Sequence, residues 1–475
     1  MTGSGTRALS GARVAAEVFR EYDLRGVFGE DLTSEVAELI GRAYRGLLPE
    51  GAPRRVAVGR DARLSSPNLA AALARGLSSG GLDVIDIGLC PTPALYYALF
   101  TEDVAGGIMV TGSHNPPEFN GFKVAVGRST IYGAEIQRLR AMVDEEARRP
   151  AGARDVGTVS EAPILEGYAR YLEEAFAHLR RLPRLKVALD CGNGAAGVVA
   201  PRVIEAAGCK IVSLYAEPDG RFPNHHPDPT LEETLADLKR AVRDEGCDLG
   251  LAFDGDGDRL GVVDERGDVI WGDRLLALLA EDVLAENPGA AVIGEVKCSQ
   301  VLYDRVEALG GRPIMAKTGH SLIKARMKTE AALIAGEMSG HFFFADRYFG
   351  YDDAVYAALR AVELLKRRRA ADAGSTMSAI AGVLPRTYAT PEIRVECAED
   401  DKAATLGRAR RGLAERRDEL GVLDVDETDG LRVRFEAGWG LIRASNTQPV
   451  LVLRFEGESP QALETIEARM RGLLA

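Results

Sequence analysis

The sequence predicts an α/β protein with three related αβ domains built on mixed sheets, followed by a smaller C-terminal α+β domain. A unit made of an apolar strand, a turn-rich loop, a helical pattern, a Gly stop and a second apolar strand recurs three times. The chain has 475 residues, which corresponds to about three domains at roughly 150 residues each. The pattern of strands and helices then changes near the C-terminal end, which indicates a further domain of another kind.

The three units follow one order along the chain. They begin at Arg55, Lys186 and Ala291, their helices stop at Gly80, Gly208 and Gly310, and their second strands start at Leu82, Cys209 and Arg312. Strand, helix and strand in succession favour βαβ units in parallel or mixed sheets. Ligands of such sheets bind at the carboxyl ends of the strands, so we expect the chemistry there.

The C-terminal part has its own layout. A charged helix end runs into small polar residues near 370–375, where we place the main boundary. Beyond it we expect a strand near Glu392, a charged helix over about 403–420, two alternating strands over 431–437 and 449–455 with a loop between them, and a closing helix. This order is typical of an α+β domain.

Composition and charge exclude several classes of function. Hydrophobic residues make up 46% and charged residues 27% of the chain, as in globular proteins. The net charge of -12 opposes binding to nucleic acid. Six Cys without C-x-x-C spacing indicate neither a disulfide framework nor a thiolate zinc site, and they favour the cytoplasm. The N-terminus lacks the apolar run of an export signal and the chain lacks a stretch of about 18 apolar residues, so we expect no membrane partner.

The sharpest motif is D-G-D-G-D-R, which follows the apolar run L-G-L-A-F. Asp254, Asp256 and Asp258 alternate with Gly, so their carboxylates can converge on one hard cation. An EF-hand is the alternative metal site, but Arg259 stands where that loop needs Gly and the flanks look like strands. Three oxygens leave coordination positions open, which suits Mg²⁺ completed by phosphate oxygen and water. The other alternative is a solvated acidic turn.

A second motif, T-G-S-H-N-P, follows the strand-like run G-G-I-M-V. Ser113 at the end of a buried strand is a candidate nucleophile. In an extended chain, His114 would point to the opposite face, so we do not expect it to act as the base for Ser113. Lys123 on the next strand and Arg25 are candidates by composition for managing the proton. A turn formed for backbone reasons is the alternative.

Two further motifs offer binding groups. R-A-S-N-T-Q-P, from Arg443 to Pro449 in the loop between the two C-terminal strands, combines a guanidinium, hydroxyls and an amide suited to a phosphate dianion, with a plain hairpin loop as the alternative. In G-E-M-S-G-H, Glu337 and Ser339 suit vicinal sugar hydroxyls, although a simple turn explains the motif equally well. Lys297 and His320 add polar groups at the ends of strands in the third unit.

Together and in this order, Y-D-L-R-G, T-G-S-H-N-P, D-G-D-G-D-R, G-E-M-S-G-H and R-A-S-N-T-Q-P resemble the α-D-phosphohexomutase superfamily, in its bacterial phosphomannomutase/phosphoglucomutase branch. C-P-T-P at Cys90, A-L-D-C-G-N-G at Ala188, F-P-N-H-H-P-D-P at Phe222 and Y-F-G-Y-D-D at Tyr348 extend the similarity over nearly the whole chain. The resemblance implies four domains around a central cleft. We place them at 1–159 (phosphoserine loop), 160–266 (metal loop), 267–375 (sugar loop) and 376–475 (phosphate loop).

The resemblance also implies an activity, the reversible conversion of hexose 1-phosphate to hexose 6-phosphate for mannose and glucose. A phosphoserine at Ser113 would donate its phosphoryl group, and a hexose 1,6-bisphosphate would be the intermediate. Glucose 1,6-bisphosphate is the implied activator and Mg²⁺ the implied cofactor. The implied partners are small sugar phosphates, and we expect a monomer.

Residue roles follow from the same resemblance. The metal ligands are Asp254, Asp256, Asp258 and the oxygen of phosphorylated Ser113. The groups that transfer protons or stabilise charge are Lys123, Arg25, Arg259, His114, His320 and His341. The substrate-binding groups are Tyr22, Lys297, Glu337, Ser339, Arg443, Ser445, Asn446 and Thr447.

Three other functions remain open from the sequence. A phosphoglucosamine mutase shares the architecture and a nearly identical sugar loop, although R-A-S-N-T rather than R-P-S-G-T favours mannose and glucose phosphates. A serine-dependent, metal-assisted phosphatase would need only one phosphate-binding loop, and the chain has two. A sugar-phosphate sensor without turnover would not need Ser113, the three Asp and Lys123 together.

Overall fold

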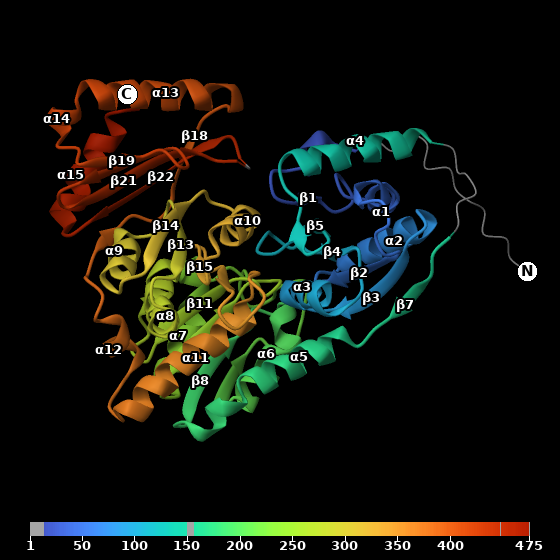
Figure 1. The fold of residues 1–475 in the computed structure, drawn as a ribbon, viewed down its shortest axis with the longest axis horizontal. Coiled ribbons are helices and arrows are strands. Elements are labelled where there is room, and N and C mark those ends of the chain that lie inside the picture. Colours follow the sequence, from blue (N-terminus) through green and yellow to red (C-terminus); the bar gives the residue numbers. More distant parts are fainter. Residues whose placement is uncertain (1–13, 150–155, 447, 475) are drawn as a thin grey trace, which may run out of the picture. The chain divides into compact units, whose positions relative to one another are not determined.

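The computed structural model describes residues 14–149, 156–446 and 448–474, and these residues form four sheets (Figure 1). They group into two compact units. The first comprises the chain up to Ile270 with Ser339–Phe342 and Tyr351–Met377, and the second comprises Trp271–Met338, Phe343–Gly350 and the chain from Ser378. Each unit is described by itself.

The first sheet lies in the first unit and runs in the order β1-β5-β4-β2-β3-β7, with β6 paired to β5. Its strands are β1 (Leu24–Val27), β2 (Arg55–Arg60), β3 (Asp83–Leu89), β4 (Gly106–Val110), β5 (Phe119–Val126), β6 (Ser129–Thr130) and β7 (Val159–Glu161). Its helices are α1 (Ser34–Tyr44), α2 (Ser66–Ser79), α3 (Thr92–Thr101) and α4 (Ala134–Arg148). β2 is parallel to β3 and β4, whereas β5 is antiparallel to β4 and β1, so the sheet is mixed.

The second sheet, also in the first unit, runs β12-β11-β10-β8-β9. Its strands are β8 (Leu185–Asp190), β9 (Cys209–Leu214), β10 (Leu249–Phe253), β11 (Leu260–Asp264) and β12 (Val269–Ile270). The helices of this part are α5 (Ile164–Ala175), α6 (Ala200–Ala206), α7 (Ala236–Asp244) and α11 (Ala354–Ala371). Figure 1 shows α11, in orange, beside the green segment of the chain. Helix α11 contacts β11, although α11 comes far later in the chain.

The third sheet, β14-β13-β15-β16, is formed by β13 (Ala291–Glu295), β14 (Arg312–Ala316), β15 (Ile334–Gly336) and β16 (Phe342–Phe344). The helices between and before these strands are α8 (Gly272–Glu286), α9 (Gln300–Ala308) and α10 (His320–Glu330). β13 is parallel to both β14 and β15. Apolar side chains of β13 and β14 pack on α10 through Ile323 and Met327 to form its core.

The fourth sheet, in the second unit, runs β17-β22-β21-β20-β19, with β18 paired to β22. Its strand pairs are antiparallel. Its strands are β17 (Tyr388–Ala389), β18 (Ile393–Glu396), β19 (Asp424–Asp426), β20 (Leu431–Phe435), β21 (Gly438–Ala444) and β22 (Val450–Gly457). The helices of this part are α12 (Met377–Ala381), α13 (Glu399–Glu415), α14 (Arg417–Leu420) and α15 (Pro460–Arg471). Short 3₁₀ helices elsewhere are η1 (Ala16–Val18), η2 (Arg45–Leu47), η3 (Ala177–Arg181), η4 (Ala195–Val198) and η5 (Glu232–Leu235).

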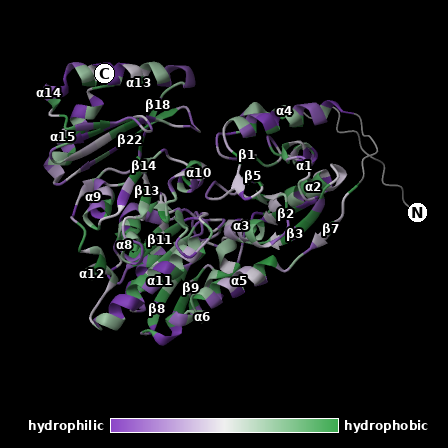
Figure 2. Ribbon diagram, viewed as in Figure 1, coloured by the Kyte–Doolittle hydropathy of each residue, from purple (hydrophilic) through white to green (hydrophobic). Residues whose placement is uncertain are grey.

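The three predicted βαβ units are confirmed. The pairs β2 and β3, β8 and β9, and β13 and β14 are each parallel and each enclose a helix. Figure 2 shows hydrophobic colour along buried strands such as β8 and β11, and hydrophilic stretches on the outer helices such as α13. The four predicted domain ranges stay a prediction.

One C-terminal prediction was wrong, and the bounds of another differ from the structure. The segment predicted as a loop between two alternating strands contains β21, because its short run G-W-G-L-I-R-A alternates around two glycines and gives a weak strand signal. The predicted helix over 403–420 instead begins at Glu399 and is interrupted at Arg416, which separates α13 from α14. Within the described residues, no helix is long and apolar enough to cross a bilayer.

Candidate active site

The loop between β4 and β5 holds Ser113 in an uncommon backbone conformation. Ser113 has φ +48°, in the left-handed region. Its hydroxyl donates to Oδ2 of Asp254 at 2.9 Å and lies 3.2 Å from Nδ1 of His114. The prediction that His114 faces away from Ser113 was therefore wrong, because it assumed an extended chain that the left-handed residue interrupts.

Side chains at the start of the loop help to set this conformation. The hydroxyl of Thr111 accepts from the Ser113 backbone N–H at 2.8 Å, and Oδ2 of Asp61 accepts from the Gly112 N–H at 3.0 Å. The guanidinium of Arg63 donates to the Ser113 carbonyl at 2.9 Å. Asp61 and Arg63 were not among the predicted site residues, although both follow the carboxyl end of β2, where ligand-binding residues of such sheets gather.

The acidic loop joins β10 to β11, so its flanks are strands and the EF-hand alternative is excluded. Asp254, Asp256 and Asp258 are fully buried, and one carboxylate oxygen from each lies within 4.8 Å of the others. Oδ1 of Asp254 accepts from the backbone N–H groups of Asp258 at 3.0 Å and Arg259 at 3.1 Å. Oδ1 of Asp256 is buried without a hydrogen-bond partner. This donor set fits a hard divalent cation that binds oxygen.

The charged groups of this cluster are in direct contact with one another. Lys123 on β5 is buried, and its ammonium donates to Oδ2 of Asp256 at 2.7 Å and to Asp258. Burial acts to lower the pKa of Lys123, but the carboxylates of Asp256 and Asp258 outweigh it and raise this pKa. Burial and the two neighbouring carboxylates raise the pKa of Asp254 well above its ordinary value. One lysine does not compensate three buried carboxylates, which is a further reason that the cluster suits a divalent cation.

Arg259 and His341 form the other side of the acidic loop. They pair as an isolated β-bridge, and Nε of Arg259 lies 3.4 Å from Nε2 of His341. The same ring nitrogen lies 3.4 Å from Oδ1 of Asp258, and Nδ1 lies 3.1 Å from the hydroxyl of Ser339. Ser339, His341 and the metal-suited carboxylates are thus connected within the first unit.

Arg25 and Tyr22 lie at the start of β1. Arg25 is buried, its Nε donates to Oδ2 of Asp23 at 3.1 Å, and its Nη1 lies 3.5 Å from the carbonyl of Thr111 next to the serine loop. Tyr22 is half-buried just before this strand. Arg25 therefore lies next to the loop that carries Ser113. Burial, and then the cations of Arg259 and Arg25, hold the pKa of His114 well below its ordinary value.

In the second unit, Lys297, Glu337 and His320 follow strands of the third sheet. Lys297 is buried and donates to Oε2 of Glu392 at 3.1 Å. Glu337 is buried, and its Oε1 accepts from the Gly319 N–H at 2.8 Å. His320 begins α10, and its Nδ1 lies 3.3 Å from the ammonium of Lys324.

The predicted phosphate loop connects β21 to β22. Arg443 lies on β21 rather than in the loop, and its Nε donates to Oδ2 of Asp429 at 2.9 Å. The hydroxyl of Ser445 accepts from the Gln448 N–H at 3.2 Å, and Asn446 is exposed. Thr447 lies outside the described residues.

Lys402 of α13 was also not among the predicted site residues. Its ammonium donates to the carbonyls of Ser445 at 2.8 Å and Gln448 at 2.6 Å. Its position within a charged helix resembles that of a surface residue, so no local signal identified it. Lys402 therefore supports the loop from the side of the helix.

Family models match consecutive parts of the chain. The phosphoglucomutase/phosphomannomutase alpha/beta/alpha domain I matches residues 16–149, domain II matches 166–267, and domain III matches 271–388. The C-terminal domain of the same family matches residues 392–473. Together these matches agree with a fold of four domains.

Individual proteins match over almost their full length. The chain is 47% identical over 460 residues to a phosphomannomutase/phosphoglucomutase of Pseudomonas aeruginosa, which covers 97% of this chain and 96% of that protein. It is 42% identical to a phosphoglucomutase of Neisseria gonorrhoeae, with 98% of each chain covered. A phosphoglucomutase/phosphomannomutase family protein of Burkholderia thailandensis has a crystal structure that superimposes with a TM-score of 0.88 at 41% identity, over 97% of this chain and 98% of that one. The chain therefore belongs to the phosphoglucomutase/phosphomannomutase family of the α-D-phosphohexomutase superfamily.

Proposed function

We propose that this protein interconverts the 1-phosphates and 6-phosphates of mannose and glucose through a phosphoserine at Ser113 and a hexose 1,6-bisphosphate. The observation that carries this proposal is the contact between the Ser113 hydroxyl and Asp254 within a buried cluster of three carboxylates. A serine held at a cation-suited site can carry a phosphoryl group whose charge the site compensates. The family relationship and the names of the matching proteins support the choice of substrates.

The reaction consists of two phosphoryl transfers. In the first, a hydroxyl of the sugar monophosphate attacks the phosphorus of phosphorylated Ser113, the bond to Oγ breaks, and a bisphosphate forms. In the second, Oγ of Ser113 takes the phosphoryl group from the other end of the bisphosphate. The free enzyme is phosphorylated again and the isomeric monophosphate leaves.

Asp254, Asp256 and Asp258 would hold Mg²⁺ with the phosphoserine oxygen. When bound, the ion supplies positive charge that stabilises the transferring phosphoryl group. Lys123 adds positive charge from the protein itself through its contact with Asp256, and Arg259, whose Nε lies 3.4 Å from Nε2 of His341, adds a second cation beside the cluster. Positioning and charge stabilisation are the main contributions that a protein makes to phosphoryl transfer.

Protons move with each transfer, because a sugar hydroxyl loses one and receives one back. His114 and His341 have ring nitrogens near Ser113 and Asp258, and Lys123 has its ammonium on Asp256. Arg25 stabilises charge beside the serine loop. We assign these residues, with His320, as the group that donates and accepts protons or stabilises charge.

Most of the proposed substrate-binding groups belong to the second unit. We propose that Arg443, Ser445, Asn446 and Thr447 bind the phosphate that is not being transferred, with help from Lys297. A guanidinium fork, hydroxyls and backbone N–H groups suit a phosphate dianion. Glu337 would accept hydrogen bonds from sugar hydroxyls. In the first unit, Ser339 and Tyr22 have the corresponding roles toward the sugar and the phosphate.

The test is ³¹P NMR of the purified protein with Mg²⁺ and a trace of glucose 1,6-bisphosphate. Mannose 1-phosphate, glucose 1-phosphate and glucosamine 1-phosphate are supplied in separate tubes. We expect 6-phosphate esters from the first two sugars. Conversion of glucosamine 1-phosphate alone would identify a phosphoglucosamine mutase, inorganic phosphate as the only product would identify a phosphatase, and no change in any tube would contradict turnover altogether.

Sugar phosphates are thus the proposed partners and Mg²⁺ with glucose 1,6-bisphosphate the proposed cofactors. A monomeric state and a cytoplasmic location remain predictions.

A further inference from the structure

The guanidinium of Arg63 makes an unusual set of contacts with the loop that carries Ser113. Arg63 follows β2, and its side chain is fully buried. It donates hydrogen bonds to four backbone carbonyls of one segment, those of Ser113 at 2.9 Å, Phe119 at 2.9 Å, and Asn115 and Pro116.

The loop is shaped to admit this guanidinium. Gly112 has no side chain where the guanidinium passes, since a Cβ there would lie 2.3 Å from Nε of Arg63. Oδ2 of Asp61 lies 3.2 Å from the same Nε and also accepts from the Gly112 N–H, so it compensates the buried charge and holds the loop entrance together. Any residue other than glycine at position 112 would have to displace the arginine.

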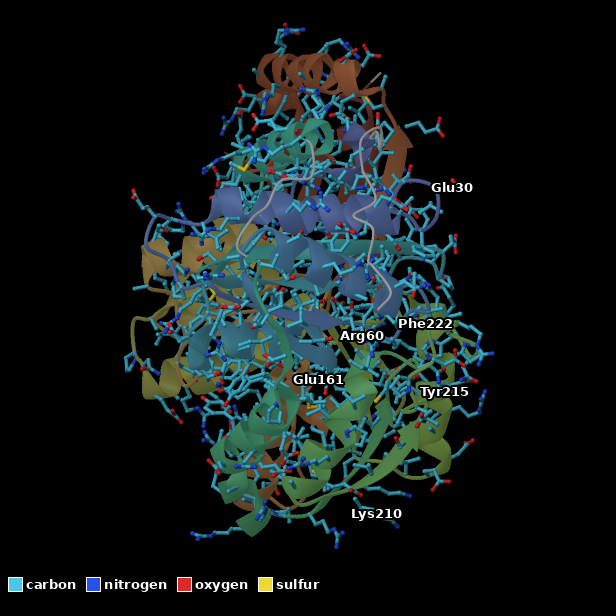
Figure 3. All side chains as sticks on the ribbon, turned by 90° about the vertical axis from the view of Figure 1, so that its right-hand side faces the viewer. Glu30, Arg60, Glu161, Lys210, Tyr215 and Phe222 are labelled. Atoms are coloured by element: carbon cyan, nitrogen blue, oxygen red, sulfur yellow. The ribbon has the colours of Figure 1, made fainter. Side chains whose placement is uncertain are left out.

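A second segment of the first unit also contacts the guanidinium. Phe222, labelled in Figure 3, packs its ring 5.2 Å from Cζ of Arg63. Phe222 begins the motif F-P-N-H-H-P-D-P, to which no chemical role has been assigned. Phe222 itself has a left-handed backbone, φ +48°, so the chain there accepts an unfavourable conformation in a segment that places the ring against Arg63.

The hydrogen bonds from Arg63 constrain the backbone conformation of Ser113. A residue with a side chain rarely adopts φ +48°, and such a conformation persists only where its surroundings determine it. Arg63 binds the carbonyl of Ser113 and three carbonyls that follow within six residues, so it fixes the peptide units on the C-terminal side of the serine. If Ser113 relaxed to an extended backbone, its hydroxyl would leave Asp254.

We propose that Arg63 is a positioning residue for phosphoryl transfer, because it holds Ser113 in the left-handed conformation that directs the hydroxyl to Asp254, and that Phe222 keeps the guanidinium in place. This inference rests on the proposed function of Ser113. Arg63 does not touch the transferring group, so its effect passes through the loop. Its loss should lower the rate of transfer to and from Ser113 and leave binding of the sugar phosphate unchanged.

The test compares Arg63→Met and Arg63→Lys with wild type. Arg63→Met keeps the length and apolar stem, and Arg63→Lys keeps the charge but lacks the planar fork that reaches four carbonyls. The matched control is Arg221→Met, which removes an exposed arginine next to Phe222 whose guanidinium pairs with Asp219. Each variant is measured for kcat and KM with glucose 1-phosphate, and for the rate at which glucose 1,6-bisphosphate phosphorylates Ser113, followed by intact-protein mass spectrometry.

For Arg63→Met we expect kcat and the rate of Ser113 phosphorylation to fall about 100-fold, the loss expected for a small misplacement of reacting groups, with KM within about twofold of wild type. Arg63→Lys should recover part of the rate, and Arg221→Met should match wild type. A role in folding alone would lower the folded fraction without changing the rates per folded molecule. Wild-type rates for Arg63→Met, or a rise in KM with kcat unchanged, would overturn the proposal.

Phe222→Leu keeps the proposal testable if Arg63→Met does not fold. It leaves Arg63 in the chain and removes only the aromatic ring, so we expect a loss of about fivefold in kcat with KM unchanged. Wild-type kcat in this variant and in Arg63→Lys would overturn the proposal. Absence of phosphorylation on Ser113 in wild type would instead contradict the proposed function, which separates the two failures.

Discussion

Replacement of Lys402 by Met tests whether the loop between β21 and β22 binds substrate. Lys402 has only 5% of its side chain exposed, and its ammonium bridges the carbonyls of Ser445 at 2.8 Å and Gln448 at 2.6 Å. It also donates to Glu399 at the start of α13. Methionine fills nearly the same volume and keeps the apolar contacts of the stem, so the substitution removes the charge and its hydrogen bonds alone.

The size of the effect depends on which of the two carbonyls is shielded from water when the ammonium is removed. The hydrogen bond to Ser445 is buried, whereas the bond to Gln448 is partly exposed, so water can replace the second donor but not the first. A hydrogen bond from a charged donor to a buried acceptor contributes about 1.5–3 kcal/mol. We therefore expect the bound geometry of the loop to be destabilised by about 2 kcal/mol, which corresponds to about a 30-fold change in an equilibrium constant.

Initial-rate kinetics with glucose 1-phosphate measure the effect. We expect KM to rise by up to about 30-fold with little change in kcat, because the loop would bind ground state and transition state alike. Glu399→Gln is the control, since Glu399 is 75% exposed and its ion pair with Lys402 should contribute less than about 1 kcal/mol. An unchanged KM in Lys402→Met, accompanied by a lower melting temperature, would refute the reasoning and leave Lys402 with a role in the fold only.

Four further predictions concern the two units. Ser113→Ala should abolish turnover and retain sugar-phosphate binding by calorimetry, and loss of both would contradict a nucleophile. Arg443→Ala should raise KM strongly by removing a phosphate contact, and an unchanged KM would move that site elsewhere. Asp256→Asn should raise the half-saturating Mg²⁺ concentration at least about tenfold, because even the loss of a residue that only supports a metal ligand weakens metal binding by this factor. An unchanged Mg²⁺ titration would exclude Asp256 as a ligand. Burial acts to raise the pKa of Glu392, but Lys297 outweighs it and lowers this pKa from 4.5 to about 2. The carboxylate therefore stabilises the fold above pH 4.5, and this contribution is lost as the pH falls toward 2. The melting-temperature deficit of Glu392→Gln should therefore be present at neutral pH and shrink over that range, and a deficit that does not depend on pH would contradict the ion pair.

Local patterns predicted most of the fold. The βαβ units around β2, β8 and β13 were predicted because apolar strands, helical spacing and Gly stops are properties of short stretches of chain. The acidic loop was predicted for the same reason, since Asp254, Asp256 and Asp258 alternate with Gly within five residues. Strand β21 was missed because its two glycines weaken the local signal.

The sequence by itself thus determined the order of the elements, the placement of polar motifs at the carboxyl ends of strands and the resemblance to a family. Only the tertiary structure decided how Ser113 is presented. Its left-handed backbone brings His114 to its hydroxyl, and Arg63, fifty residues earlier, holds the loop by its carbonyls. Lys402 likewise reaches its loop across more than forty residues. Such contacts depend on which segments the packed sheets bring together, and backbone carbonyls carry no mark in the sequence by which their partners can be recognised.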